Sequence, residues 1–363
     1  MSDVNENILK SVSVNLLYDG MVLQDDIYDS TGDRLLLTSG NVIDDSQIEN
    51  IISLNNGSYT IYVTGRTHEA MVSRKPEIEV ESHGKIEEVT GYTEKKDETF
   101  KLLEEIAQKK AVSMESMKVL SHDLSARLDS TPPAVIISLI NAMAPVDEYL
   151  QRHSVNVSFL NGLVGRWMGL SAVEVDKLVL IGLMHDCGKT MLPPKVLNAP
   201  RKLTSVEYEV IKMHAKYTYD LLSEFPEPIR IAASSHHERL NGGGYPKRLA
   251  SGDVILEARI TAISDTYDAM VSQRVYQGPQ SPFSVMAKLE NMSKNELDST
   301  LIRIFLENMP KELVDKPVKM SDGTIGIVCE YDANDIEFPN VALSGRVIKT
   351  NRDIYCVTMY NND

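Results

Sequence analysis

The amino-acid sequence predicts a multidomain protein, in which an all-α domain follows a small α+β domain and precedes a small β-rich C-terminal segment. A length of 363 residues is sufficient for two or three separate cores. The period of the apolar residues also changes twice along the chain, from mixed to helical and then to strand-like. The predicted limits are residues 1–65 for the α+β domain, 66–96 for a linker, 97–312 for the helical domain and 313–363 for the β-rich segment.

The α+β domain is predicted from short β-rich runs at residues 13–17, 35–37 and 59–63, with a helix near residues 45–52. The stretch that follows, from Thr64 to about Lys96, is rich in Glu, Lys, Ser and Thr and has little periodicity. Such a composition is typical of a linker.

The helical domain is predicted from apolar residues that recur at three- and four-residue spacing from Leu102 onward. Capping signals mark three helix starts, which are Ser171 with Glu174, Thr204 with Glu207, and Ser281 before Pro282. After Pro310 short β-branched runs alternate with turns, and residues 354–360 have a strong preference for strand.

Composition and charge argue against several classes of protein. A net charge of -15 does not suit a surface for polymeric nucleic acid, which needs clustered Lys and Arg. The longest apolar stretch, residues 178–184, is far shorter than the roughly 18 residues of a membrane span, and the acidic start does not resemble a secretory signal. Three widely spaced cysteines form no disulfide framework. We therefore expect a cytoplasmic protein without a membrane or nucleic-acid partner.

A cluster of possible metal ligands lies within the helical region. The cluster contains five of the eight histidines and two aspartates, and its members are His153, His185, Asp186, His214, His236, His237 and Asp265. Imidazole and carboxylate suit first-row transition metals. Any one of these histidines taken alone would more often be an ordinary, partly buried side chain. Their grouping favours a metal site.

Local position supports this interpretation. His185 and Asp186 end the apolar segment 178–184, where polar groups without a partner are costly. Asp265 and Asp268 are three residues apart and share a helix face, so one can bind metal while the other faces a substrate.

Two motifs give a specific resemblance. The run His185-Asp186-Cys187-Gly188-Lys189 resembles the HD signature of metal-dependent phosphohydrolases, and residues 236–246, which read HHERLNGGGYP, resemble the HHE…GYP element of the HD-GYP family. The resemblance covers about residues 147–276. It implies an HD-type helical fold, two or three iron or manganese ions, and hydrolysis of the substrate cyclic di-GMP.

The resemblance also implies roles for individual residues. His153, His185, Asp186 and Asp265 would hold one metal, and Asp186 would bridge to a second held by His214, His236 and His237. Trinuclear members carry a glutamate four residues before the first histidine, where this chain has Tyr149. The neighbouring Glu148 lies about 100° away around a helix, so we predict two divalent ions and the linear product pGpG.

The chemistry expected of such a site is phosphodiester hydrolysis. Two cations sharing Asp186 would activate a bridging hydroxide, and Lys189 would hold a non-bridging oxygen as a point charge. The alternative for Lys189 is an ordinary surface lysine. By resemblance the substrate contacts are Lys189, Gly244, Tyr245, Asp268 and Arg274. A glycine-rich loop alone is weak support, and Arg274 has the alternative of a surface ion pair.

Two departures from the family pattern leave other functions open. Arg274 is followed by Val275, Tyr276 and Gln277 where the family has Pro, Tyr and a basic residue, and Thr218 replaces a common glycine. One alternative is therefore a catalytically weak or inactive scaffold that senses a cyclic dinucleotide. A second alternative is a phosphodiesterase for another cyclic dinucleotide, because a stacking pocket does not by itself distinguish guanine. The N-terminal domain could mediate a homodimer or bind a regulatory protein.

Overall fold

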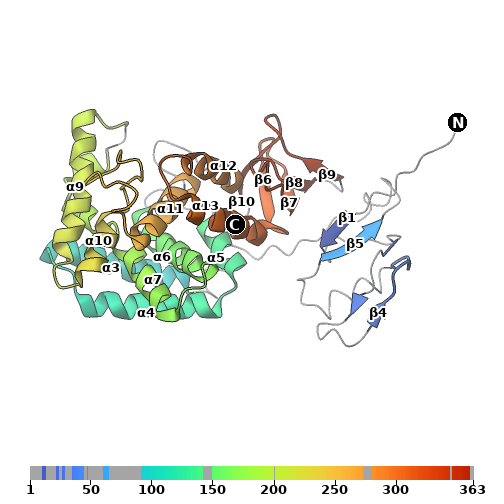
Figure 1. Ribbon diagram of the computed structural model, residues 1–363, viewed down its shortest axis with the longest axis horizontal. Helices are drawn as coiled ribbons and strands as arrows, with labels where there is room; N and C mark the ends of the chain where they lie inside the picture. The colour runs from blue at the N-terminus through green and yellow to red at the C-terminus, as the bar shows by residue number, and fades with distance from the viewer. Residues whose placement is uncertain are drawn as a thin grey trace.

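The computed structural model describes residues 10–13, 22–23, 27–28, 35–44, 47, 60–64, 91–141, 149–199, 201–272, 280–343 and 346–359. Two parts of the prediction are confirmed, because a helical domain is followed by an antiparallel sheet (Figure 1). The helical segments are α3 (Tyr92–Lys109), α4 (Met114–Ser130), α5 (Pro133–Ile140), α6 (Tyr149–Trp167), α7 (Ala172–Met184), η4 (Cys187–Met191), α8 (Pro194–Leu197), α9 (Ser205–Leu221), α10 (Glu227–Ser234), α11 (Leu256–Val271), α12 (Pro282–Met292), α13 (Ser299–Asn308) and η5 (Met309–Leu313).

The helical domain begins earlier than predicted. Helix α3 starts at Tyr92, inside the segment that was predicted to be a linker. Its first turns are mostly polar and lack an apolar stripe, yet Tyr92 and Lys95 are both buried. The Lys95 ammonium lies 2.8 Å from a Glu98 oxygen and 3.0 Å from one of Asp123 on α4. The pair with Asp123 joins two helices, so the periodicity of the sequence cannot predict it.

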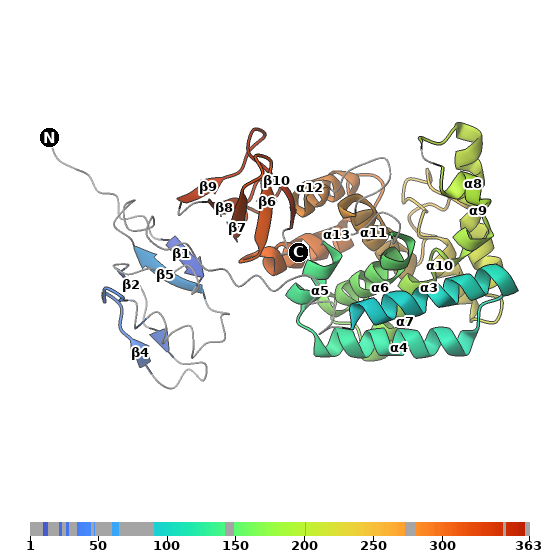
Figure 2. The ribbon, with the colours of Figure 1, turned by 180° about the vertical axis from the view of Figure 1, so that it is seen from behind.

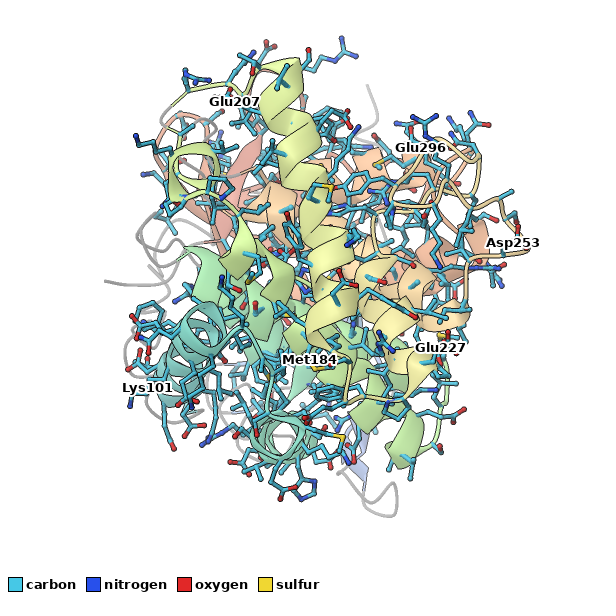
Figure 3. The ribbon with its side chains drawn as sticks, turned by 90° about the vertical axis from the view of Figure 1, so that its left-hand side faces the viewer. Lys101, Met184, Glu207, Glu227, Asp253 and Glu296 are labelled. Atoms are coloured by element: carbon cyan, nitrogen blue, oxygen red, sulfur yellow. The ribbon has the colours of Figure 1, made fainter. Side chains whose placement is uncertain are left out.

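Helices α6 and α7 form the centre of the helical domain, and α3 and α4 run beside them (Figure 2). Helix α7 begins at a capping box in which Ser171 and Glu174 exchange hydrogen bonds. Its second half is buried throughout, and Met184 lies inside whereas Lys101 and Glu207 lie at the periphery (Figure 3). The burial of the apolar half of α7 therefore fixes the position of His185 and Asp186, which follow it directly.

Gly182 sets the distance between α6 and α7. A Cβ atom at this position would lie 2.7 Å from the Cα atom and 2.8 Å from the backbone nitrogen of Ser158 on α6. The two backbones can approach this closely only because residue 182 has no side chain. This crossing brings His153 on α6 near His185 at the end of α7.

The C-terminal sheet consists of β6 (Pro317–Met320), β7 (Ile325–Glu330), β8 (Asn340–Leu343), β9 (Arg346–Lys349) and β10 (Cys356–Met359). Its order is β10-β6-β7-β8-β9, and every neighbouring pair is antiparallel. Strand β10 contacts α12, and Val318, Val328 and Val341 belong to the same buried core as the helices.

Short strands are also described in the N-terminal region. They are β1 (Lys10–Ser13), β2 (Val22–Leu23), β3 (Ile27–Tyr28), β4 (Leu35–Leu37) and β5 (Thr60–Thr64), in the orders β1-β5-β2 and β3-β4. Asp44 and Gln47 exchange two hydrogen bonds, which form a capping box where the helix near 45–52 is predicted to begin. Apart from Gln47, that helix lies outside the described residues, so the α+β domain stays a prediction.

In the part of the chain that the structure describes, no helix has both the length and the apolar character that a membrane crossing requires.

The α6–α7 crossing generates a stability prediction. We expect Gly182→Ala to lower the free energy of unfolding by about 1–3 kcal/mol, because the added methyl group overpacks two backbones. Chemical denaturation followed by far-UV circular dichroism measures the change. Gly252→Ala is the matched control, since a Cβ atom there meets nothing within 4 Å. Equal stability of the two variants would contradict the close crossing.

Candidate metal centre

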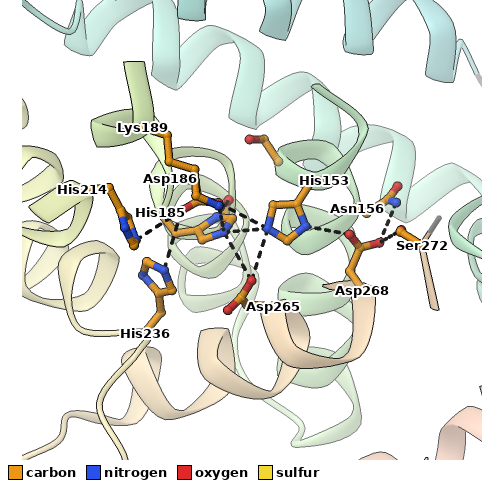
Figure 4. Close-up of polar contacts among 12 residues, drawn as sticks. His153, Asn156, His185, Asp186, Lys189, His214, His236, Asp265, Asp268 and Ser272 are labelled. Atoms are coloured by element: carbon orange, nitrogen blue, oxygen red, sulfur yellow. Dashed lines mark hydrogen bonds and ion pairs between the residues drawn. The ribbon is translucent and has the colours of Figure 1, made fainter. Parts of the chain in front are cut away.

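The structure brings all seven predicted ligands together in one buried cluster. Figure 4 labels six of them, all except His237. They come from different elements: His153 from α6, His185 and Asp186 from the end of α7, His214 from α9, His236 and His237 from the turn after α10, and Asp265 from α11. All are buried except His237, which is partly exposed. These donors already lie close to one another in the structure.

The Asp186 carboxylate lies between two groups of donors. Its Oδ2 atom is 3.4 Å from Nε2 of His153 and 3.3 Å from Nε2 of His185. Its Oδ1 atom is 3.4 Å from Nε2 of His214 and 3.8 Å from Nε2 of His236. Each oxygen therefore faces a different pair of imidazoles, which is the arrangement of a bridging ligand.

The remaining donors complete two sets. Asp265 Oδ1 lies 3.2 Å from Nε2 of His153, and His153, His185 and Asp265 form one set. Asp186, His214, His236 and His237 form the other, and within each set the donor atoms lie within 4.8 Å of one another. Three or four nitrogen and oxygen donors around one point match the coordination of a divalent transition metal.

Several atoms of the cluster are buried without a hydrogen-bond partner. Among the described residues these include Asp186 Oδ1, His214 Nε2 and His236 Nε2. A buried polar atom without a partner costs about 1–3 kcal/mol, more if it is charged. Cations bound between these atoms would satisfy them, so the residues present fit a metal pair.

The orientation of the imidazole rings also suits metal binding. Three histidines bond through Nδ1 to a backbone oxygen three residues earlier at 2.7 Å: His185 to Gly182, His214 to Ile211 and His236 to Ala233. A carbonyl can only accept, so Nδ1 carries the proton and Nε2 presents a lone pair to the cluster.

Asp268 forms a hydrogen bond with one of the predicted ligands, His153. Its side chain is completely buried rather than open to a substrate. Its Oδ2 atom accepts a hydrogen bond of 2.6 Å from Nδ1 of His153, and its Oδ1 atom accepts one of 2.7 Å from Asn156. Asp268 therefore orients a ligand. The helix spacing predicted that Asp265 and Asp268 share a face, but it did not predict that Asp268 is completely buried.

Burial and neighbouring charges favour the ligand forms of the side chains. Burial lowers the pKa of His236 to about 3 and also lowers the pKa of His214 and His237. Burial alone would raise the pKa of Asp186, but the Lys189 ammonium and His185 outweigh it and hold that pKa well below its usual value. These imidazoles are therefore neutral and the carboxylate is ionised.

The turn that carries Lys189 is tied to α9. Lys189 pairs with Asp186 Oδ2, which places its ammonium at the carboxylate that both ligand sets share. Thr218 accepts a hydrogen bond of 3.0 Å from the Gly188 nitrogen and donates one of 3.1 Å to the His185 carbonyl. Thr218, which stands where the family commonly has glycine, thus connects the turn at Gly188 to α9.

Cys187 is buried, and burial raises the pKa of its thiol to about 12, as expected of a small core residue.

The glycine-rich loop places Tyr245 over the cluster. The Tyr245 ring stacks on His237 with 4.5 Å between centroids, and the ring is partly exposed. Gly244 is buried, and a Cβ atom there would lie 2.4 Å from the Arg239 nitrogen. Close packing of this turn explains the glycine at position 244, and its predicted contact with the substrate stays a prediction.

Four residues with clear contacts to the site were not predicted. Glu238 accepts backbone hydrogen bonds from Lys247 at 2.6 Å and Leu249 at 2.9 Å, which fixes the loop that carries Tyr245. Asn156 lies three residues after His153, a spacing that could have revealed it. Nothing in the sequence pattern signals Tyr92, which bonds Asn156, or Lys212, whose ammonium lies 5.7 Å from the Tyr245 ring centroid.

Arg274 and Gln277 lie outside the described residues, as does the side chain of Tyr149. The substrate contact of Arg274 and the metal count inferred from Tyr149 therefore stay predictions.

Comparison with known proteins agrees with this geometry. Residues 138–301 match the family model described as HD domain. A cyclic di-GMP phosphodiesterase of Thermotoga maritima is 31% identical over 185 residues, which cover 50% of each chain. The cyclic di-GMP phosphodiesterase response regulator RpfG of Xanthomonas campestris is 41% identical over 125 residues, or 33% of each chain. A 3'3'-cGAMP-specific phosphodiesterase of Vibrio cholerae is 32% identical over 178 residues, covering 48% of this chain and 41% of the relative.

One solved structure shares the fold. Bd1817, described as an HDG"Y"P protein from Bdellovibrio bacteriovorus, matches with a TM-score of 0.51 over 84% of this chain and 100% of the other, at 14% identity. The chain spans about half the length of the first curated relatives it matches. Residues 138–301 are therefore similar to HD domains, and the curated relatives that match the chain are named as phosphodiesterases of cyclic dinucleotides.

Proposed function

We propose that this protein is a metal-dependent phosphodiesterase that hydrolyses cyclic di-GMP to linear pGpG at a dinuclear site. The observation that carries the proposal is the Asp186 carboxylate, whose two oxygens face two separate sets of donors. Iron or manganese is the metal we propose, because imidazole and carboxylate suit both. The cytoplasmic location predicted from the sequence belongs to the same proposal.

A metal pair bound here would supply an activated water and would neutralise charge on the phosphoryl group. The geometry of the site would be set by residues of the chain. Asp186 would keep the two ligand sets at a fixed separation. Lys189, whose ammonium already lies at the shared carboxylate, would hold a non-bridging phosphoryl oxygen as negative charge develops.

The surface beside the cluster suits a nucleotide. Tyr245 presents a partly exposed ring, and the Lys212 ammonium lies 4.8 Å from the centroid of Tyr208, which is 48% exposed. Aromatic faces stack on nucleobases, and a lysine supplies local positive charge in a chain of net charge -15. Lys212 also pairs with Glu209, so part of its charge is already balanced.

A second substrate is also supported. The relatives include proteins named as 3'3'-cGAMP-specific phosphodiesterases, in addition to those named for cyclic di-GMP. A stacking surface alone does not distinguish guanine from adenine. The test of function therefore compares both cyclic dinucleotides.

The activity test uses the full chain, loaded anaerobically with Fe²⁺ or Mn²⁺ and given each cyclic dinucleotide separately. We expect faster hydrolysis of cyclic di-GMP, with pGpG as the first product resolved by chromatography. Binding without turnover would contradict the enzyme and favour a dinucleotide-sensing scaffold. Preferred hydrolysis of 3'3'-cGAMP would assign the second substrate, and GMP as the dominant early product would contradict the two-metal site.

Lys189 generates a separate prediction. We expect Lys189→Ala to lower kcat about 10²–10³-fold, because one preorganised positive charge at the phosphoryl group is lost. Metal content, measured by mass spectrometry, should stay at two ions per chain. Lys118→Ala on α4 is the control, because that lysine is exposed on a helix that carries no site residue.

Asp186→Ala is the informative comparison for Lys189→Ala. It should remove the shared carboxylate and therefore lose metal and activity together. If Lys189→Ala also lost metal, the lysine would serve the structure of the site rather than the reaction. An unchanged kcat would make it an ordinary surface residue.

A further inference from the structure

His153 is held differently from the other buried histidines of the cluster. His185, His214 and His236 each bond a carbonyl three residues earlier, so the local chain sets the ring. The Nδ1 atom of His153 instead bonds the Asp268 carboxylate, which is 115 residues away on α11. Its orientation therefore depends on tertiary contacts that the other three do not need.

These contacts continue beyond Asp268. Asn156 donates from Nδ2 to Asp268 Oδ1 at 2.7 Å, and its Oδ1 atom accepts a hydrogen bond of 2.5 Å from the Tyr92 hydroxyl. Asp268 is fully buried, and Asn156 and Tyr92 are each 1% exposed. Tyr92, Asn156, Asp268 and His153 thus form a buried relay, which runs from the first residue of α3 to a metal ligand.

Each step of the relay constrains the next. An asparagine amide can rotate to exchange its oxygen and nitrogen, and a hydroxyl that donates to Oδ1 favours the orientation that turns Nδ2 toward Asp268. The Asp268 carboxylate then has a fixed acceptor for the His153 Nδ1 proton. A carboxylate in this position fixes the ring and makes the opposite nitrogen a stronger donor to a metal.

We propose that Tyr92 and Asn156 are positioning residues that tune the affinity of one metal position, the one formed by His153, His185 and Asp265. The inference rests on the proposed dinuclear site. In the other position, formed by Asp186, His214, His236 and His237, the shared Asp186 contacts the relay only through His153 Nε2, at 3.4 Å. The relay therefore makes the two positions unequal.

The test is the titration of metal-free full chain with Mn²⁺, followed by the electron paramagnetic resonance signal of the free ion. For Tyr92→Phe we expect two bound ions, of which one has an affinity lower by about ten-fold while the other is unchanged. That size is the lower end of the 10–100-fold effect typical of groups that orient metal ligands. Asn156→Ala, which removes the direct partner of Asp268, should weaken the same position by up to about 100-fold.

Tyr267→Phe is the matched control. Tyr267 is fully buried, and its hydroxyl bonds Asn141 Oδ1 at 2.9 Å, so the variant loses an equivalent hydrogen bond outside the relay. Thermal melting of each variant measures the general loss of stability. We expect similar melting temperatures for Tyr92→Phe and Tyr267→Phe, but weakened metal binding only for Tyr92→Phe.

Three results would overturn the inference. Unchanged affinities in both Tyr92→Phe and Asn156→Ala would show that the relay does not reach the metal. Equal weakening of both positions, or the same change in Tyr267→Phe, would show general destabilisation. In each of these cases the proposed dinuclear site survives, whereas a wild-type chain that binds no Mn²⁺ overturns that site as well.

Discussion

The structure depends on the burial of one ionised carboxylate. Asp186 is only 2% exposed, and a buried negative charge is costly unless opposite charge and hydrogen bonds compensate it. The Lys189 ammonium supplies part of that compensation, and one oxygen still lacks a hydrogen-bond partner in the described structure. A pair of cations would supply the rest. The helices that supply the cluster therefore enclose the charge of Asp186, which would be unfavourable in a purely apolar core.

Apolar packing nevertheless determines where the ligands meet. The buried half of α7 and the close crossing at Gly182 fix His185 relative to α6. Thr218 connects the following turn to α9, and Glu238 anchors the loop that carries Tyr245. Ligands held in this way lose little further conformational freedom when a metal binds, which is what preorganisation of a site means.

The sequence predicted which side chains form the cluster, but it did not predict the contacts that hold these side chains in place. The motifs and the family resemblance named all seven side chains that the structure brings together, and capping boxes located the starts of α7 and α9. The spacing did not predict that Asp268 is buried and bonded to His153, because helical spacing indicates a shared face but not whether that face meets solvent or another helix. The start of α3 at Tyr92 was missed because the Lys95–Asp123 ion pair and the Tyr92–Asn156 hydrogen bond join residues far apart in the chain. Contacts of that kind follow from tertiary packing, and no local pattern encodes them.

The central claim is that Asp186 bridges two metals, and anomalous X-ray diffraction from crystals loaded with Mn²⁺ tests it most directly. We expect two anomalous peaks on either side of the carboxylate, one beside Oδ2 with His153, His185 and Asp265, the other beside Oδ1 with His214, His236 and His237. A single peak, a third peak, or peaks that do not share Asp186 would contradict the account.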